Sequence, residues 1–84
     1  MTIETIKNNA ELTVKVTGRM DTITAPQLEN ELKENIDGAE KLILDFEALE
    51  YISSAGLRVL LMAQKAMNKQ GEMVVKNVNE DIAE

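Results

Sequence analysis

The sequence predicts a small α/β fold, with an N-terminal β-hairpin followed by parallel strands and helices packed on the sheet. Three observations carry this prediction. Residues 11–17 alternate between apolar and polar side chains, as in a strand with one buried face. Residues 28–36 place an apolar residue at every fourth position, as in an amphipathic helix. From residue 42 to 78, a strand, an apolar helix and another strand follow one another, which predicts a parallel βαβ unit.

Length and composition limit the classes of function. A chain of 84 residues has the size of one domain, so we expect a single domain over residues 1–84. It contains neither Cys nor His, which excludes thiolate and histidine metal sites and a Ser-His-Asp enzyme, and we expect no metal and no cofactor. A net charge of −6 argues against nucleic acid as a partner. Without a long apolar run or a signal-like N-terminus, we expect no membrane insertion and a cytoplasmic location.

The first third of the chain reads as a hairpin and a connection. We expect strands at residues 2–7 and 11–17, joined antiparallel by a turn at Asn8-Asn9. The segment from Gly18 to Ile23 is expected to leave the second strand as a loop. Within it, Asp21 either binds its own backbone or forms an acidic wall of a site.

The first helix is expected to start at Thr24, with Gln27 three residues later in the spacing of a capping box. Ile23 and Leu28 stand on either side of this cap, where they would form a hydrophobic staple. The helix is expected to end at Asp37-Gly38.

The second half of the chain predicts three strands around one helix. Residues 41–46 form a continuous apolar run, typical of a strand covered on both faces. Tyr51-Ile52 is a short extended piece, residues 54–70 a helix with Gly71 as its C-cap, and residues 73–78 the last strand. The apolar surface of this helix is wider than one stripe, so part of it is a candidate partner surface. The positions expected in the core are Leu57, Leu60, Leu61 and Met67.

The junction between the short strand and this helix carries Ser53-Ser54-Ala55-Gly56. The first N–H groups of a helix have no partner within the helix, and together with the helix dipole they favour an anion. A phosphate added to a serine at this position would therefore meet favourable electrostatics. The alternative is that the serine only caps the helix, a contribution of about 1 kcal/mol.

The order of these segments resembles the STAS domain, and more closely the bacterial anti-sigma factor antagonists. The resemblance covers the whole chain. The segments that carry it are Gly18-Arg19-Met20-Asp21 with Thr24-Ala25, residues 42–46, residues 51–57 and Gly71-Glu72-Met73.

This resemblance implies a cycle of partner switching. The unphosphorylated antagonist binds an anti-sigma factor serine kinase and frees a sigma factor; the kinase phosphorylates one antagonist serine, and a serine phosphatase restores it. The acceptor implied by position is Ser54, two residues before Gly56. Many members have Asp where this chain has Ser53; because two serines are therefore adjacent here, Ser53 is the alternative acceptor. The implied partner-binding residues are Asp21, Thr22, Ser53, Ser54, Ala55, Gly56 and Arg58.

Family members continue further, through a third helix and a final strand. Here Asn79 predicts the start of a third helix, but the sequence stops at Glu84. The C-terminal helix and last strand are thus expected to be truncated, or replaced by a second chain in a homodimer or swapped dimer.

The charge of a phosphate supplies a mechanism for the switch. A phosphoserine adds about −1.5 to −2 charge, and the acids expected near it are Asp21, Glu47 and Glu50. A like charge about 5 Å away costs roughly 3 kcal/mol at an effective dielectric of about 20, which is about a hundredfold in affinity. The alternative functions are a STAS regulatory subunit of a transporter or stress-signalling assembly, a serine-nucleophile enzyme, and a structural fragment.

Overall fold

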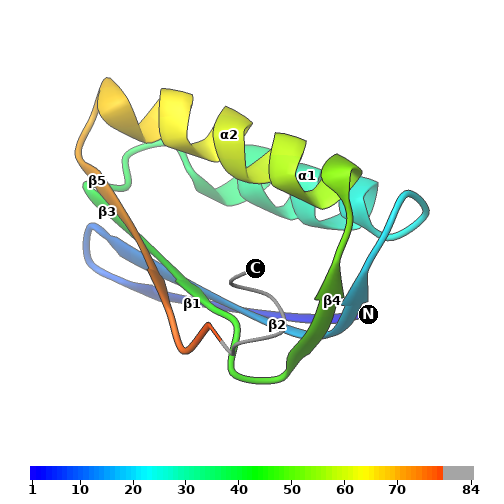
Figure 1. Cartoon of the computed structure of the whole chain (residues 1–84). Helices are drawn as coiled ribbons and strands as arrows, with labels where there is room; N and C mark the ends of the chain where they lie inside the picture. The colour runs from blue at the N-terminus through cyan, green and yellow to red at the C-terminus, as the bar shows by residue number, and fades with distance from the viewer. Residues whose placement is uncertain (79–84) are drawn as a thin grey trace.

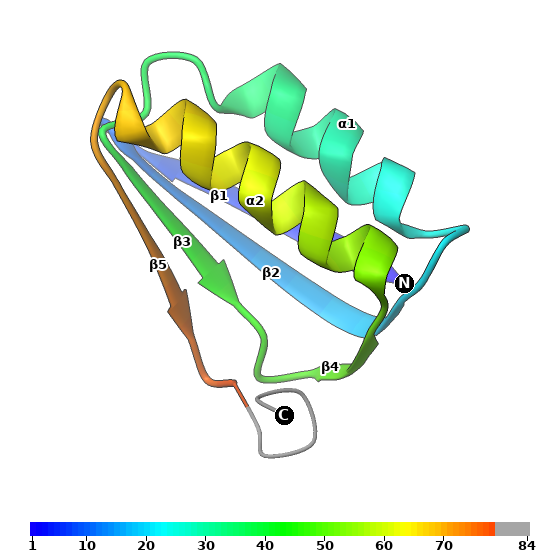
Figure 2. The same ribbon diagram turned by 45° about the horizontal axis from the view of Figure 1, so that its top comes forward.

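The computed structural model describes residues 1–78, which form a two-layer α/β structure. Both helices lie on the same face of one curved sheet (Figures 1 and 2). The elements are β1 (Thr2–Asn8), β2 (Glu11–Met20), α1 (Ala25–Asn35), β3 (Lys41–Asp45), β4 (Leu49–Ile52), α2 (Ser54–Asn68) and β5 (Glu72–Lys76). The predicted α/β class and the order of its elements are confirmed, and the expected third helix at Asn79 lies outside the described residues.

The sheet is mixed and has the strand order β1-β2-β3-β5. β1 pairs antiparallel with β2, as the predicted hairpin requires, and β3 pairs parallel with both β2 and β5. β2 has ten residues and pairs in parallel with two different strands along its length. Its residues 11–15 pair with β3, and its residues 18–20 pair with β4.

One hydrophobic core fills the space between the sheet and the two helices. The alternation along β2 and β3 points every second side chain toward the helices. The helices pack apolar residues three or four positions apart against these side chains. Burying each large apolar side chain contributes about 1.5–3 kcal/mol. The fully buried large side chains are Leu12, Val14, Val16, Met20, Leu28, Leu32, Leu42, Leu44, Phe46, Leu49 and Met67.

Two expectations about the strands are wrong. The helices cover the strand at 41–46 on one face only: Leu42 and Leu44 are buried beneath them, whereas on the other face Ile43 is half-buried and Asp45 is buried where Asn77 and the Glu47 N–H bond it. The second strand also does not end at residue 17. It continues to Met20, whose side chain is fully buried, and a β-bulge with Glu50 as the extra residue accommodates the pairing with β4.

The predicted start of α1 is correct in position but wrong in mechanism. Thr24 is the N-cap residue, but its side chain makes no capping hydrogen bond to the helix, so the capping box does not form. Asp21 instead accepts from the N–H groups of Ile23 and Thr24. The Ile23 side chain is 82% exposed, which also rules out the staple.

The end of α2 likewise differs from its prediction. The helix ends at Asn68 with Lys69 as the C-cap residue, and Gly71 is not in the left-handed region. A Cβ on Gly71 would collide with the main-chain carbonyl of Glu40, so glycine is needed for close approach rather than for backbone conformation. Among the described residues, no helix is long and apolar enough to cross a membrane.

Candidate functional site

The ends of β2 and β4 bring two distant segments of the chain together. Met20 pairs with Ile52 in the parallel register, and the Ser53 N–H donates to the Met20 carbonyl oxygen at 2.8 Å. One residue earlier, the Arg19 guanidinium lies over the Tyr51 ring, 4.4 Å from its centroid. The segment that starts with Asp21 therefore lies beside the serines that open α2.

Gly56 allows the first turn of α2 to pack directly against these strand ends. A Cβ at this position would lie 2.7 Å from Cγ1 of Ile52 and 2.8 Å from Sδ of Met20, closer than real Cβ contacts. Glycine thus brings the helix backbone into contact with the ends of both strands. The position of the two serines depends on this close packing.

Ser53 is the N-cap residue of α2. Its backbone is extended, and its Oγ accepts from the Gly56 N–H at 3.3 Å. Its side chain is half-buried, and its carbonyl oxygen accepts from the Leu57 N–H at 3.0 Å. Ser53 therefore performs the structural role that an N-cap serine ordinarily has.

Ser54 is the first residue of the helix and is exposed. Within residues 1–78, its hydroxyl has no hydrogen-bond partner. The same part of the chain offers no partner to the backbone N–H groups of Ser54 and Ala55. An accessible hydroxyl thus stands next to two unpaired donors at the positive end of the helix dipole.

Asp21 forms a tight turn with its own neighbours. Its Oδ1 accepts from the N–H groups of Ile23 at 3.0 Å and Thr24 at 2.9 Å, and its own N–H donates to the Thr24 hydroxyl. The Thr24 hydroxyl lies within hydrogen-bond distance of both the Asp21 carboxylate and the Arg19 carbonyl oxygen. These bonds, above all those from Thr24, hold the pKa of Asp21 below its usual value of 3.8.

A groove separates the first turns of α1 and α2. It has a volume of about 200 Å³ and brings three of the predicted partner-binding residues, Thr22, Ala55 and Arg58, to one place. The residues that line it are Thr22, Ala25, Pro26, Glu29, Ala55, Arg58 and Val59. The groove is not lined by Asp21, Ser53 or Ser54. Each of these is within two residues, along the chain, of one that lines it.

Two leucines of α2 belong to the surface, although both were predicted in the core. Leu57 is 51% exposed and Leu61 is 63% exposed, at positions three and seven residues after Ser54. This spacing places them on the same side of the helix as Ser54. Met67 is buried as predicted and Leu60 is half-buried, because Val59, Ala63 and Met67 form the stripe that faces the sheet.

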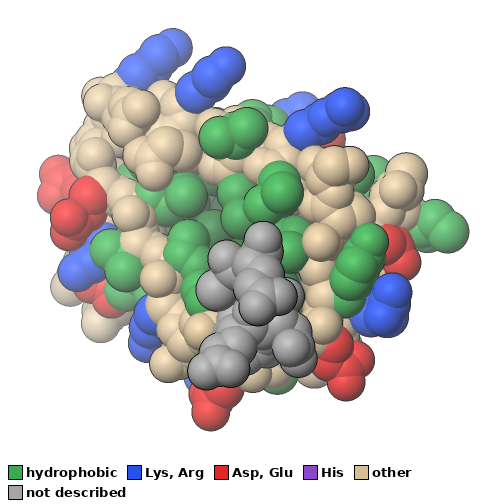
Figure 3. Space-filling view, viewed as in Figure 1, with side chains coloured by type: hydrophobic (Ala, Val, Ile, Leu, Met, Phe, Trp, Pro, Cys, Tyr) green, Lys and Arg blue, Asp and Glu red, His purple; other side chains and the backbone are tan. Residues whose placement is uncertain are grey.

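The space-filling view in Figure 3 shows hydrophobic side chains along α2 and in the region between α2 and β5. The wide apolar surface of this helix in the sequence was the signal for such a patch. Periodicity alone did not identify which leucines belong to it.

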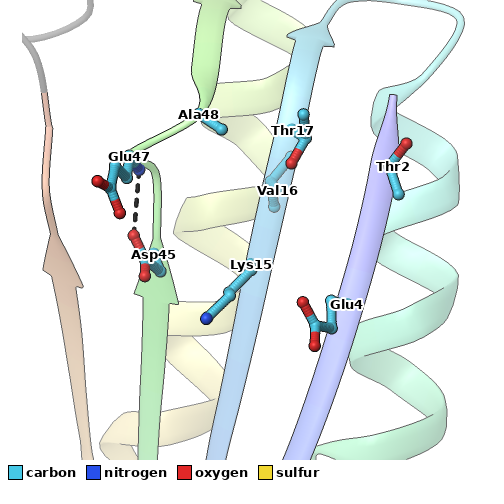
Figure 4. Close-up of a pocket in the computed structure, with 8 residues that line it drawn as sticks. All are labelled: Thr2, Glu4, Lys15, Val16, Thr17, Asp45, Glu47 and Ala48. Atoms are coloured by element: carbon cyan, nitrogen blue, oxygen red, sulfur yellow. Dashed lines mark hydrogen bonds between the residues drawn. The ribbon is translucent and has the colours of Figure 1, made fainter.

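Glu47 does not lie at the serine junction, contrary to its expected place near a phosphate on Ser54. It precedes β4, whereas the serines follow that strand, and its side chain lines a cavity of about 140 Å³ together with Asp45 and Lys15. Figure 4 shows this cavity on the sheet face opposite the helices. Of the other two acids expected near the phosphate, Asp21 directly follows β2 beside the serine junction, and Glu50 lies within β4.

Comparison with known proteins identifies the class to which this fold and site belong. The family model of the STAS domain matches residues 1–84. BtrV of Bordetella bronchiseptica, named as an anti-sigma factor antagonist, is 41% identical over 69 residues, which is 80% of this chain and 60% of that protein. This chain therefore spans less than two thirds of the length of that relative.

The anti-sigma-B factor antagonist of Staphylococcus aureus is 31% identical over 84 residues, covering 98% of this chain and 78% of that protein. The fold matches the anti-sigma factor antagonist SpoIIAA, in its unphosphorylated form, with a TM-score of 0.82 at 15% identity, over 95% of this chain and 76% of that one. The chain belongs to the STAS domain family, among its anti-sigma factor antagonists.

Proposed function

We propose that this protein is a phosphorylation-controlled binding module that acts on an anti-sigma factor. In its unmodified form it binds an anti-sigma factor serine kinase and releases a sigma factor. The kinase phosphorylates Ser54, which ends the complex, and a serine phosphatase reverses the modification. The observation that carries this proposal is the difference between the two serines: one hydroxyl caps the helix, and the other is exposed without a partner in the described chain.

The choice of Ser54 over Ser53 follows from what each hydroxyl does. Phosphorylating Ser53 would turn the hydroxyl oxygen that accepts from the Gly56 N–H into an ester oxygen and would place a dianion at a half-buried position. Phosphorylating Ser54 leaves that cap in place. The added charge meets the positive end of the helix dipole, an effect of up to about 2 kcal/mol.

The same charge explains how the modification would end binding without refolding. The exposed surface around Ser54 combines two leucines, Leu57 and Leu61, with the Arg58 side chain. A partner that binds this surface of the unphosphorylated protein would bury the two leucines around a neutral hydroxyl. A phosphate there must be desolvated on binding and repels acidic groups of the partner, so the affinity falls while the fold is unchanged.

Phosphate mapping tests the acceptor. The chain is incubated with ATP and the kinase-fold anti-sigma factor of its own host, and the intact mass and fragments are measured. We expect one phosphate on Ser54, absent in Ser54→Ala and retained in Ser53→Ala. A phosphate that persists in Ser54→Ala would move the acceptor to Ser53. No phosphate on the wild-type chain would contradict the proposal and favour the regulatory-subunit alternative.

Binding measurements test the switch itself. Titration calorimetry with the same anti-sigma factor should show Ser54→Asp binding about a hundredfold more weakly than wild type, with thermal unfolding nearly unchanged. Ser54→Ala serves as the control, because it removes the hydroxyl without adding charge and should bind like wild type. Equal affinities for the Asp and Ala variants would contradict an electrostatic switch at this residue.

A further inference from the structure

The face of the sheet opposite the helices is uncovered by any described helix (Figure 1). Parallel strands seldom have a bare face, because their usual crossover helices cover both sides. Here three of the four strands across the sheet are parallel, yet α1 and α2 occupy the same side. This face, called the bare face below, is therefore a candidate binding surface.

Three apolar side chains and one threonine form a row across the middle of this face. The register aligns Ile6 on β1, Thr13 on β2, Ile43 on β3 and Val74 on β5. Ile6 is 42% exposed and Val74 is 38% exposed, so the two ends of the row are open to solvent. Such an apolar row gains free energy when it is covered.

A row of alternating charge runs beside it. The register aligns Glu4, Lys15, Asp45 and Lys76 in strand order, so acidic and basic residues alternate across the sheet. Figure 4 shows Lys15 on β2 between Glu4 and Asp45. Asp45 is 7% exposed, and its carboxylate uses only Oδ1 for its bonds from Asn77 and the Glu47 N–H, so the contact left to a second chain is at Oδ2, which has no hydrogen-bond partner among residues 1–78.

We propose that this face binds a second copy of the chain, in a two-fold dimer whose axis runs parallel to the strands between β2 and β3. This operation places β1 over β5 of the other copy and β2 over its β3. Glu4 then lies opposite Lys76 and Lys15 opposite Asp45, while Ile6 meets Val74. Glu11 and Lys41, which are aligned on β2 and β3, become opposite partners as well. The face is thus complementary to itself in charge and in apolar position.

The face is small, which favours a weak dimer. Four strands about 4.8 Å apart and five residues long, at about 3.3 Å per residue, present roughly 19 by 17 Å. This is below the roughly 800 Å² per partner of a standard interface, even after side-chain relief is counted. We therefore expect a reversible dimer with a dissociation constant of roughly 0.1 mM that weakens as salt is added.

Charge reversal at the outer strands tests the arrangement. Sedimentation velocity of the full chain up to about 1 mM should show dimer for wild type. Glu4→Lys places Lys opposite Lys76, and Lys76→Glu places Glu opposite Glu4, twice in each dimer. Each single variant should weaken dimerisation about tenfold or more. Matched charge changes on the helices, Glu34→Lys and Lys65→Glu, should leave it unchanged.

Two rescues distinguish this pairing from a general charge effect. A mixture of the Glu4→Lys and Lys76→Glu variants restores opposite charges at both contacts, so the mixed dimer should form. The double variant Glu4→Lys/Lys76→Glu should also regain self-association. A wild-type chain that stays monomeric at about 1 mM would overturn the proposal, as would single variants that dimerise like wild type or a mixture that stays monomeric.

Discussion

Ser53 and Ser54 are adjacent in sequence and have the same side chain, yet the fold gives them different tasks. The extended backbone of Ser53 turns its hydroxyl back to the Gly56 N–H, whereas Ser54 is the first residue of the helix, is exposed, and has a hydroxyl without a partner among residues 1–78. Removing the Ser53 hydroxyl should therefore lower stability, whereas removing the Ser54 hydroxyl should abolish phosphorylation and leave stability nearly unchanged.

Ser53→Ala should lower the free energy of unfolding by about 1 kcal/mol, because the Gly56 N–H loses its acceptor. Ser54→Ala is the matched control and should stay within about 0.5 kcal/mol of wild type, since the exposed hydroxyl stabilises nothing in the described chain. Urea unfolding followed by circular dichroism measures both. Equal losses would mean that the cap is not formed as described.

The sequence indicated the pair of serines and the helix they open, but not their division of labour. Asp21 shows a similar limit: its two open interpretations were a backbone-binding turn and an acidic wall, and the hydrogen bonds place it in the turn. Thr24 was assigned the cap by spacing, but its hydroxyl is already engaged by the Asp21 N–H and the Arg19 carbonyl oxygen, and Asp21 accepts from the Ile23 and Thr24 N–H groups. Competing acceptors so close in sequence cannot be ranked by pattern alone.

At the scale of elements, the contact between α2 and the ends of β2 and β4 positions the site. Strand and helix types were predictable because alternation and four-residue spacing report a buried face directly. The length of β2 was not, because Gly18-Arg19 resembles a loop and the pairing that extends the strand comes from β4, far along the chain. Nor could the sequence tell that Leu57 and Leu61 lie more than half exposed on the helix surface.

Gly56→Ala tests this contact between α2 and the strands. The new methyl group would press against the Ile52 and Met20 side chains, so we expect a loss of about 1–3 kcal/mol in unfolding free energy. Introduced into a Met20→Ala background, the same substitution should cost less, because space has been opened beside it. A double-mutant cycle measured by urea unfolding gives the coupling. No coupling between the two positions would contradict the packing described.

At the scale of the whole molecule, two aspartates connect the fold to pH. Hydrogen bonds, from Asn77 first and then from the Glu47 N–H, hold the pKa of Asp45 below 3.8, and the Thr24 bonds do the same for Asp21. The charges of Lys76 and Lys15 act on the pKa of Asp45 in the same direction. A carboxyl group with a pKa lower in the folded than in the unfolded state adds stability above the unfolded value. That stability is lost as pH falls through the folded pKa.

We therefore expect the urea midpoint to fall as pH decreases from about 5 toward 3. Asp45→Asn should lower stability near neutral pH and flatten part of this acid dependence, because the titrating group is gone. Glu34→Gln is the matched control, an exposed acid with no side-chain hydrogen bond among the described residues. An Asp45→Asn variant with an unchanged pH profile would contradict the role of this carboxylate.

The two-layer architecture as a whole followed from the sequence, but the bare face of the sheet did not. The apolar run at residues 41–46 predicted cover on both sides, and Ile43 accounts for that error, since it belongs to the uncovered face. An apolar residue in a run indicates contact without telling whether the partner is part of the same chain.

The division of β2 between two parallel neighbours has a consequence for how such a protein can diversify. Residues 11–15 of this strand pair with β3, while residues 18–20 pair with β4 and lie next to the start of α2. Within the second segment, substitutions of the exposed Arg19 can reshape the surface beside the serine junction, while the buried Met20 keeps its place in the core. Natural selection can therefore retune recognition at one end of a single strand while the other end keeps the molecule folded.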